Sequence, residues 1–414
     1  MRDKTLVVVG AGPKGLAIYL KAKALRSFRK KPPRIVVIDN QGVAANWNGS
    51  RGFTDGNEEL ATPPELDLGY PYSSTDPRLN DTMRRFSWHS YLQGKRRYTE
   101  WIDKGSPPPT HLTWAKYLWW TVKGDKEWNE NYLAGRVVDA RWAKGHWELE
   151  YRSSGDGELK SIKAHGIVIT GPGASRHIAI SEPHEALSKA MCTGQTFWNH
   201  AHLARFAKLR DGKVVVIGAG DTAATIVVKL ANLLSEKVRL AWLTLSGSLY
   251  TRSESFAVRR YYSDPDSWVR LPVDARERLI ASAHEGVVSL RTLARVDGLH
   301  RAIDFEVGEV MGTKWNSEKG RVVLSLEGRA EPLECERVVV AIGFDDLSCR
   351  DVLPEGFFPR HAAHVSHKIG RDLMYDETGI HLPMLAALKQ GPGFPTLGCL
   401  GILSDRILEA YCAL

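Results

Sequence analysis

The sequence predicts an α/β fold, because short apolar runs rich in β-branched residues alternate with stretches of helical character. Apolar runs at 5–9 and 34–38 enclose a glycine-rich turn and a helical stretch at 10–23. The same order of strand, glycine turn, helix and strand returns between 213 and 245. Continuous apolar runs joined by helices are typical of parallel sheets buried on both faces. The 414 residues are also too many for one ordinary core, so two units are expected.

The first glycine turn reads GAGPKG over residues 10–15, and the strand after it ends in Asp39. Gly10 permits a tight turn, Gly12 leaves room for a pyrophosphate, and Gly15 allows a helix to pack closely on a strand. Free N–H groups and the positive end of the helix would meet the phosphates, and Asp39 can accept hydrogen bonds from ribose hydroxyls. A strand before, a helix after and an acid at this distance favour a Rossmann-like dinucleotide site over a chance turn.

The second turn has Gly218 and Gly220, followed by Asp221 and Thr222, with Ala223 in the third glycine place. No acid ends its second strand, where Ser246 lies with Arg252 soon after. Hydroxyls and an arginine favour the 2′-phosphate of NADPH over the free ribose of NADH. The alternative is that Arg252 is a solvated surface charge.

Two dinucleotide sites imply two cofactors, FAD held tightly and NADPH held transiently. We therefore expect a glutathione-reductase-like flavoprotein in which an NADPH-binding domain is inserted in an FAD-binding domain. The expected FAD domain covers 1–175 and 335–414, and the NADPH domain covers 205–330. Two further strands end in small residues at 170–173 and 341–343, where a backbone could approach another group closely. Residues 46–120 show weak periodicity, which is typical of a functional segment.

Composition and charge exclude several other classes of protein. A net charge of +8 suits anionic ligands such as nucleotide phosphates, but without a binding module it does not indicate nucleic acid. No apolar run is long enough for a membrane span, and no signal-peptide pattern is present at the start, so we expect a cytoplasmic protein. The five cysteines form no CxxC pair, which argues against a disulfide reductase. His200 and His202 lack partners at metal-ligand spacing, so no metal site is expected.

Several blocks, taken in order, resemble the mycobactin-type L-lysine ε-N-hydroxylases, which are N-hydroxylating flavin monooxygenases of siderophore biosynthesis. The blocks are ANW at 45–47, FTDG at 53–56, TPPELDLGYPY at 62–72, RFSW at 85–88, EWID at 100–103, SDP at 263–265, QGPGFP at 390–395 and GILSDR at 401–406. This resemblance runs nearly from end to end and is far more specific than either glycine turn. A fingerprint of Baeyer–Villiger enzymes is absent between the two turns.

The resemblance implies an enzyme that uses FAD, NADPH and O2. In this family NADPH reduces FAD, a flavin hydroperoxide forms, and a neutral amine attacks its distal oxygen, so no catalytic side chain is required. A desolvated site would help to keep the amine neutral. The implied FAD contacts are Gly10, Gly12, Pro13, Lys14, Gly15, Asp39, Asn46, Trp47 and Thr62. The implied NADPH contacts are Gly218, Gly220, Asp221, Thr222, Ser246 and Arg252. Members of the family often form dimers or tetramers, so a homo-oligomer is expected.

The substrate segment departs from the family pattern. Leu66 stands where the family has a Lys that pairs with the substrate α-carboxylate, and Arg259 falls where it has an Asn. Either Arg259 takes over the carboxylate of lysine, or the substrate is another amine: ornithine, a diamine, an arginine-like compound or a carrier-bound amino acid. Leu403 and Ser404 match tail positions near the substrate, although Ser404 could instead cap a helix. A non-hydroxylating FAD/NADPH oxidase or redox-sensing module is the alternative class.

Overall fold

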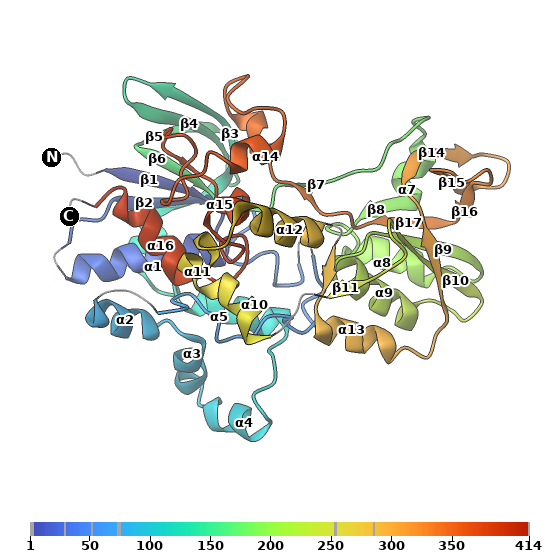
Figure 1. Ribbon diagram of the computed structural model, residues 1–414, viewed down its shortest axis with the longest axis horizontal. Helices are drawn as coiled ribbons and strands as arrows, with labels where there is room; N and C mark the ends of the chain where they lie inside the picture. Colours follow the sequence, from blue (N-terminus) through green and yellow to red (C-terminus); the bar gives the residue numbers. More distant parts are fainter. Residues whose placement is uncertain are drawn as a thin grey trace.

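A computed structural model describes residues 4–28, 30–50, 53–72, 76–251, 255–284 and 286–412. The described chain forms two α/β units side by side, each around its own sheet (Figure 1). This arrangement confirms the predicted fold class. Among the described residues, no helix combines the length and the apolar character needed to cross a bilayer.

The first sheet has seven strands in the order β19-β6-β1-β2-β3-β4-β5. The four strands from β19 to β2 are parallel, and β3 is parallel to β2, whereas β4 and β5 complete an antiparallel meander. Their bounds are β1 Thr5–Val9, β2 Arg34–Asp39, β3 Tyr132–Ala143, β4 His146–Ser153, β5 Leu159–Ala164, β6 Gly166–Ile169 and β19 Ile380–His381.

The second sheet has five parallel strands in the order β13-β10-β9-β17-β8. They are β8 Met191–Thr193, β9 Gly212–Ile217, β10 Val238–Thr244, β13 Ile303–Val307 and β17 Arg337–Val340. A small antiparallel sheet covers it, made of β14 Val310–Asn316, β15 Arg321–Leu326 and β16 Leu333–Cys335.

The expected domain boundaries at 205 and 335 shift outward. The second sheet already includes β8, before residue 205, and it includes β17, which the sequence assigned to the returning outer domain. After β17 the chain returns to the first unit through β18 (Phe344–Asp345), which pairs with β7 (Ala174–Ser175) on the outward connection. The connection that leaves the first unit after β6 and the one that returns after β17 are therefore hydrogen-bonded to each other.

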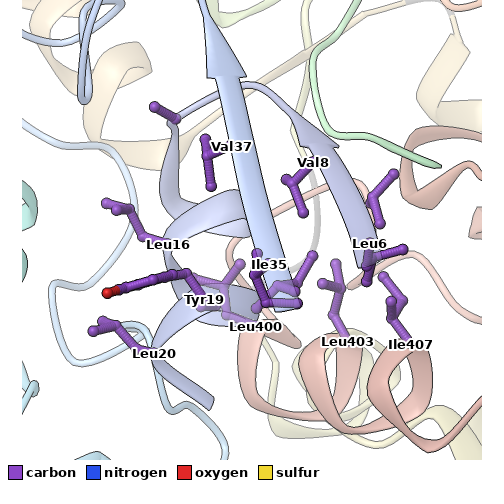
Figure 2. Packing of buried hydrophobic residues seen from close by; sticks show 14 of the residues in the cluster. Leu6, Val8, Leu16, Tyr19, Leu20, Ile35, Val37, Leu400, Leu403 and Ile407 are labelled. Atoms are coloured by element: carbon purple, nitrogen blue, oxygen red, sulfur yellow. The ribbon is translucent and has the colours of Figure 1, made fainter. Parts of the chain in front are cut away.

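Helices α1 (Pro13–Ser27) and α16 (Leu400–Glu409) cover one face of the first sheet. Proline at the first turn of α1 suits a helix start, because its missing N–H needs no partner there. Figure 2 shows Leu400 and Leu403 of α16 beside Ile35 and Leu6 of the strands, in the same cluster as Leu16 and Leu20 of α1. Leu403 of α16 lies in this core with no exposed surface.

Residues 77–120 are more regular than the sequence indicated. After an irregular stretch they form α2 Pro77–Arg84, α3 Trp88–Gly94, α4 Tyr98–Asp103 and α5 His111–Trp120. Asp76, Ser87 and Thr110 cap three of these helices with their side chains. Trp88 and Trp101 are buried, and their rings meet edge to face.

Helices α10 (Phe256–Ser263), α11 (Pro265–Val269) and α12 (Val273–His284) lie within the expected NADPH domain but pack on the first unit (Figure 1). The Trp268 Nε1–H donates to the Leu388 carbonyl at 3.0 Å, and the Cys399 thiol donates to the Tyr262 carbonyl at 2.8 Å. The span 205–330 is thus not one continuous domain. The remaining elements are α6 Lys126–Asn131, α7 Glu185–Ala190, α8 His200–Ala207, α9 Asp221–Leu233, β11 Tyr250–Thr251, β12 Val287–Val288, α13 Leu290–Asp297, η1 Ser348–Val352, α14 Ala362–Ser366, η2 Pro383–Leu385 and α15 Ala387–Gln390.

Candidate active site

One cavity of about 630 Å³ lies where the two units face each other. Both glycine turns reach it, the first through Gly10 and Gly12 and the second through Asp221 and Thr222. Such a crevice, at the carboxyl ends of parallel strands, is where open α/β folds bind ligands. The strand end at 170–173 also lines it, as does Phe344.

Residues 341–343, at the other strand end, are not among the described residues that line the cavity. The close approach expected at the two strand ends is instead one of backbone to backbone. A Cβ on Gly173 would meet the Asp345 carbonyl oxygen at 2.0 Å, and one on Gly218 would meet that of Ala341 at 2.2 Å.

The first glycine turn has the shape that a phosphate group needs. Gly10 has φ +112°, and a Cβ there would meet the Thr170 Oγ1 at 2.3 Å. A Cβ on Gly15 would meet the Gly10 carbonyl oxygen at 2.2 Å, so α1 packs directly on the turn. A Cβ on Gly12 would meet no described atom within 4 Å, because Gly12 borders the cavity. The first N–H groups of α1 therefore open on free space, as an anion site requires.

Asp39 organises the same turn from the end of β2. Its Oδ2 accepts the Ala11 N–H at 2.9 Å, and its Oδ1 accepts the N–H groups of Gln41 and Gly42, each at 2.7 Å. Asp39 is half-buried and lines the cavity. A carboxylate offers about four acceptor sites, so one stays available for a ligand hydroxyl.

Lys14 connects the first turn with the C-terminal segment. Its Nζ donates to the Pro395 carbonyl at 2.8 Å, and Pro395, Thr396 and Leu397 line the cavity. Burial lowers the pKa of the Lys14 ammonium to about 8. This ammonium therefore loses its proton more readily than that of a free lysine, because it has lost water.

The second glycine turn is held from two sides. Gly218 has φ +131°, and a Cβ there would meet the Ala341 carbonyl oxygen at 2.2 Å. Asp221, the first residue of α9, accepts the N–H and the hydroxyl of Ser289 on its Oδ1 at 3.0 and 3.2 Å. These bonds fix the start of α13 beside the turn.

Two ion pairs connect the segment after Trp47 with helices of the second unit. The Glu58 Oε2 lies 2.5 Å from Arg295 NH1 on α13, and the Asp55 Oδ2 lies 2.8 Å from Lys229 Nζ on α9. Glu58, Arg295 and His111 line the cavity, and the sequence reasoning missed all three. No spacing or motif marks them, because their neighbours come from distant parts of the chain.

The residues expected to bind FAD gather at this cavity, with one exception. Asn46, Trp47 and Thr62 line it together with Pro13, Lys14 and the residues of the first turn described above. Gly15 lies behind the turn, where it supports packing. Of the residues expected to bind NADPH, Ser246 is exposed beyond the end of β10, and Arg252 lies outside the described residues.

The residues expected to bind substrate are not among the described residues that line this cavity. Leu66 is half-buried, and Arg259 is exposed on α10. Leu403 belongs to the core because its side of α16 faces β1 (Figure 2). Ser404 is fully buried inside α16, where its hydroxyl donates to the Gly401 carbonyl at 2.8 Å, so the helix-capping alternative is wrong. Substrate contact by these four residues stays a prediction.

Comparison with known proteins decides the family. Residues 2–346 match the model of a family described as L-lysine 6-monooxygenase/L-ornithine 5-monooxygenase. The chain belongs to this family. It is 33% identical to L-lysine N6-monooxygenase MbtG of Mycobacterium tuberculosis over an alignment that covers 99% of this chain and 95% of that protein. This family membership identifies the chain as an amine N-hydroxylating monooxygenase.

Solved structures agree with this assignment. Lysine monooxygenase NbtG from Nocardia farcinica superposes with a TM-score of 0.79 at 31% identity, covering 98% of each chain. The reduced form of ornithine hydroxylase PvdA from Pseudomonas aeruginosa gives a TM-score of 0.75 at 19% identity, covering 99% of this chain and 98% of that one. At that identity the second likeness shows a shared fold.

Proposed function

We propose that this family member uses FAD and NADPH to hydroxylate the side-chain amine of L-lysine, for a siderophore or another natural product. The relatives named for lysine hydroxylation, similar over nearly the whole chain, support this substrate. The observation that carries the cofactor proposal is the single cavity on which both glycine turns open.

The residues present fit the two dinucleotides. The open space beside Gly12 and the uncapped start of α1 suit the pyrophosphate of FAD, and Asp39 has an acceptor site left for a ribose hydroxyl. Gly218, Gly220 and Thr222 form the corresponding turn for NADPH, with Ser246 near its ribose end. When bound, the two cofactors would supply the reducing power and the activated oxygen for transfer to the amine.

The protein's own contribution is to bind the amine without its proton. Free lysine has a side-chain pKa near 10.4, so its amine is almost fully charged at neutral pH. Burial lowers the pKa of the Lys14 ammonium to about 8, and a substrate amine that lost its water on binding would shift toward its neutral form for the same reason. Apolar walls from Trp47, Leu60 and Phe344 would also keep water from the reacting atoms.

A second candidate is hydroxylation of a different amine. Leu66 offers no charge to a substrate carboxylate, and Arg259 is exposed on α10, outside the described lining of the cavity. A diamine or a carrier-bound amino acid has no free carboxylate to be recognised. An arginine-like compound or ornithine would need a cation from elsewhere.

The deciding experiment measures hydroxylamine formed by purified FAD-loaded protein with NADPH and O2. L-lysine, L-ornithine, L-arginine, cadaverine and putrescine are tested in parallel, with NADPH consumption and hydrogen peroxide recorded. Hydroxylated lysine in proportion to NADPH supports the proposal. Coupled product from another amine moves the assignment to that amine, and peroxide without product from any of them favours an oxidase.

Arg259→Ala tests how lysine would be held. If Arg259 pairs with the carboxylate, the KM for lysine rises at least about 10-fold with little change in kcat. Arg270→Ala, which removes an exposed arginine just after α11, serves as the control. An unchanged KM in Arg259→Ala removes this residue from substrate recognition.

A further inference from the structure

His111 begins α5 and lines the cavity between the two glycine turns. Its ring meets the Trp47 ring edge to face, with centroids 5.0 Å apart and an interplanar angle of 85°. Its backbone N–H donates to the Glu58 carbonyl at 2.8 Å, and the Glu58 side chain pairs with Arg295 of the second unit. The imidazole is therefore fixed at the point where the two units meet.

The two ring nitrogens of His111 have different surroundings. Nδ1 is buried and has no hydrogen-bond partner. Nε2 likewise makes no hydrogen bond to any described group. Unlike Nδ1, it is not fully buried. Because the ring lines the cavity, Nε2 is the nitrogen that a molecule in the cavity can reach.

The imidazole is uncharged at neutral pH. Burial, helped by the charge of Arg295, lowers the pKa of His111 to about 4, although Asp55 opposes this shift. A neutral imidazole carries one N–H. A proton on Nδ1 would be sealed in the protein without an acceptor, whereas a proton on Nε2 faces open space. Nε2 is therefore best assigned as the donor.

Contacts on both sides indicate what this donor would meet. On one side, the Trp47 N–H donates to the Ala44 carbonyl, and the Ala44 N–H donates to the Ala11 carbonyl in the first turn. On the other side, Arg295 belongs to α13, whose first turn is bonded to Asp221 at the second turn. If the phosphates of the two dinucleotides bind at the two glycine turns, their redox-active rings would both lie in the cavity between these turns. The acceptors on such rings are the carbonyl oxygens and the N1 and N5 nitrogens of the flavin, and the carboxamide oxygen of the nicotinamide.

We propose that the Nε2–H of His111 donates a hydrogen bond to an acceptor atom of the redox-active ring system held in this cavity, either a carbonyl oxygen or a flavin ring nitrogen. The ring is that of the flavin or that of the nicotinamide. This inference rests on the proposed use of FAD and NADPH. It assigns to His111 a binding and positioning role, and neither glycine turn predicts that role.

The test uses three substitutions that separate the N–H from the ring. His111→Phe keeps a ring against Trp47 and removes both nitrogens. His111→Gln places an amide near the position of Nε2, and His111→Asn places one near that of Nδ1. His89→Phe is the matched control, because His89 is exposed, its ring meets Tyr98 edge to face, and it is not among the described residues that line the cavity.

FAD affinity of the apoprotein, NADP⁺ affinity of the FAD-loaded protein, and the flavin absorption spectrum are measured for each variant. We expect His111→Phe and His111→Asn to weaken one of the two affinities about 3- to 10-fold, the loss of one hydrogen bond. His111→Gln and His89→Phe should stay within about 2-fold of the wild type. A loss in FAD affinity with a shifted flavin spectrum assigns the bond to the flavin. A loss confined to NADP⁺ assigns it to the nicotinamide.

Two results would overturn the inference. One is wild-type behaviour of all three His111 variants. The other is wild-type affinity in His111→Phe together with a loss in His111→Gln, which would mean that the ring acts by packing alone. Thermal unfolding of the apoproteins identifies any variant that is simply misfolded. If His111→Phe is misfolded, the cofactor affinities of His111→Gln and His111→Asn decide whether a donor is needed at the position of Nε2. If the wild type binds neither FAD nor NADP⁺, the proposed function fails as well. If the wild type binds both and the His111 variants bind as it does, only the inference about His111 fails.

Discussion

Asp67 shows at the scale of one residue how burial and hydrogen bonds compete. Its side chain lies in the segment that includes Leu66 and is only 3% exposed. Oδ1 accepts the Tyr72 hydroxyl at 2.7 Å and the Gly69 N–H at 3.2 Å, and Oδ2 accepts the Trp88 N–H at 3.0 Å. Burial nevertheless outweighs these donors and raises the pKa of Asp67 to about 6.

This shift predicts a pH dependence of stability. An unfolded Asp has a pKa near 3.9, so between about pH 4 and 6 the folded state holds a proton that the unfolded state has lost. The Asp67 contribution to the free energy of unfolding is therefore greatest below pH 4 and falls as pH rises through 6, by roughly 3 kcal/mol in all.

Asp67→Asn, which does not ionise, isolates this contribution. Urea unfolding of both proteins at pH 4, 5, 6 and 7 should show the wild type losing stability relative to the variant as pH rises. A difference between the two proteins that stays constant across this range would contradict the assignment to Asp67.

At the scale of elements, the glycine turn before α1 has one glycine that packs against the backbone and another that borders the cavity. A Cβ on Gly15 would collide with the backbone of Gly10, whereas a Cβ on Gly12 would enter the cavity. Both residues have ordinary negative φ values, so the difference is one of surroundings. The same motif thus contains one position that serves the fold and one that would serve a cofactor.

Gly12→Ala and Gly15→Ala form a matched pair. We expect Gly15→Ala to lower the free energy of unfolding of the apoprotein by about 3 kcal/mol, the cost of overpacking. Gly12→Ala should cost less than about 1 kcal/mol, as for an alanine at a helix N-cap, yet reduce FAD affinity at least about 10-fold. Urea unfolding and FAD titration measure the two effects. Equal losses of stability in the two variants would show that Gly12 is also a packing position.

At the scale of the whole molecule, two units share one cavity, and ion pairs hold them across it. Glu58 is 8% exposed, and its carboxylate pairs with the Arg295 guanidinium. Removing one partner of a buried pair leaves an uncompensated charge, which costs more than removing both. The pair therefore helps to set how closely the second unit approaches the first.

Arg295→Met should lower the free energy of unfolding by roughly 2 kcal/mol, and adding Glu58→Gln should recover part of that loss. Hydrogen exchange should also become faster in residues 53–62 and in α13, where the contact is lost. Arg84→Met, which breaks an exposed pair with Asp81, should change stability by less than about 0.5 kcal/mol. If the double variant had a lower free energy of unfolding than Arg295→Met alone, the two charges would contribute to stability independently.

Local patterns in the sequence determined both α/β units and their glycine turns. A strand, a glycine turn and a helix follow one another within about 30 residues, so short-range sterics and apolar periodicity are enough to predict them. The blocks at 45–72 and 390–406 likewise indicated the enzyme family, because each block is a short continuous run whose residues and order are legible along the chain.

Only the tertiary structure decided which distant segments meet. The placement of β17 in the second sheet, of α10 to α12 on the first unit and of Leu403 in the core depends on packing between residues far apart in the chain. The same is true of His111, Glu58 and Arg295 at the cavity. Their neighbours are separated by up to hundreds of positions, and no local pattern records such contacts, because burial and charge pairing are properties of the folded chain.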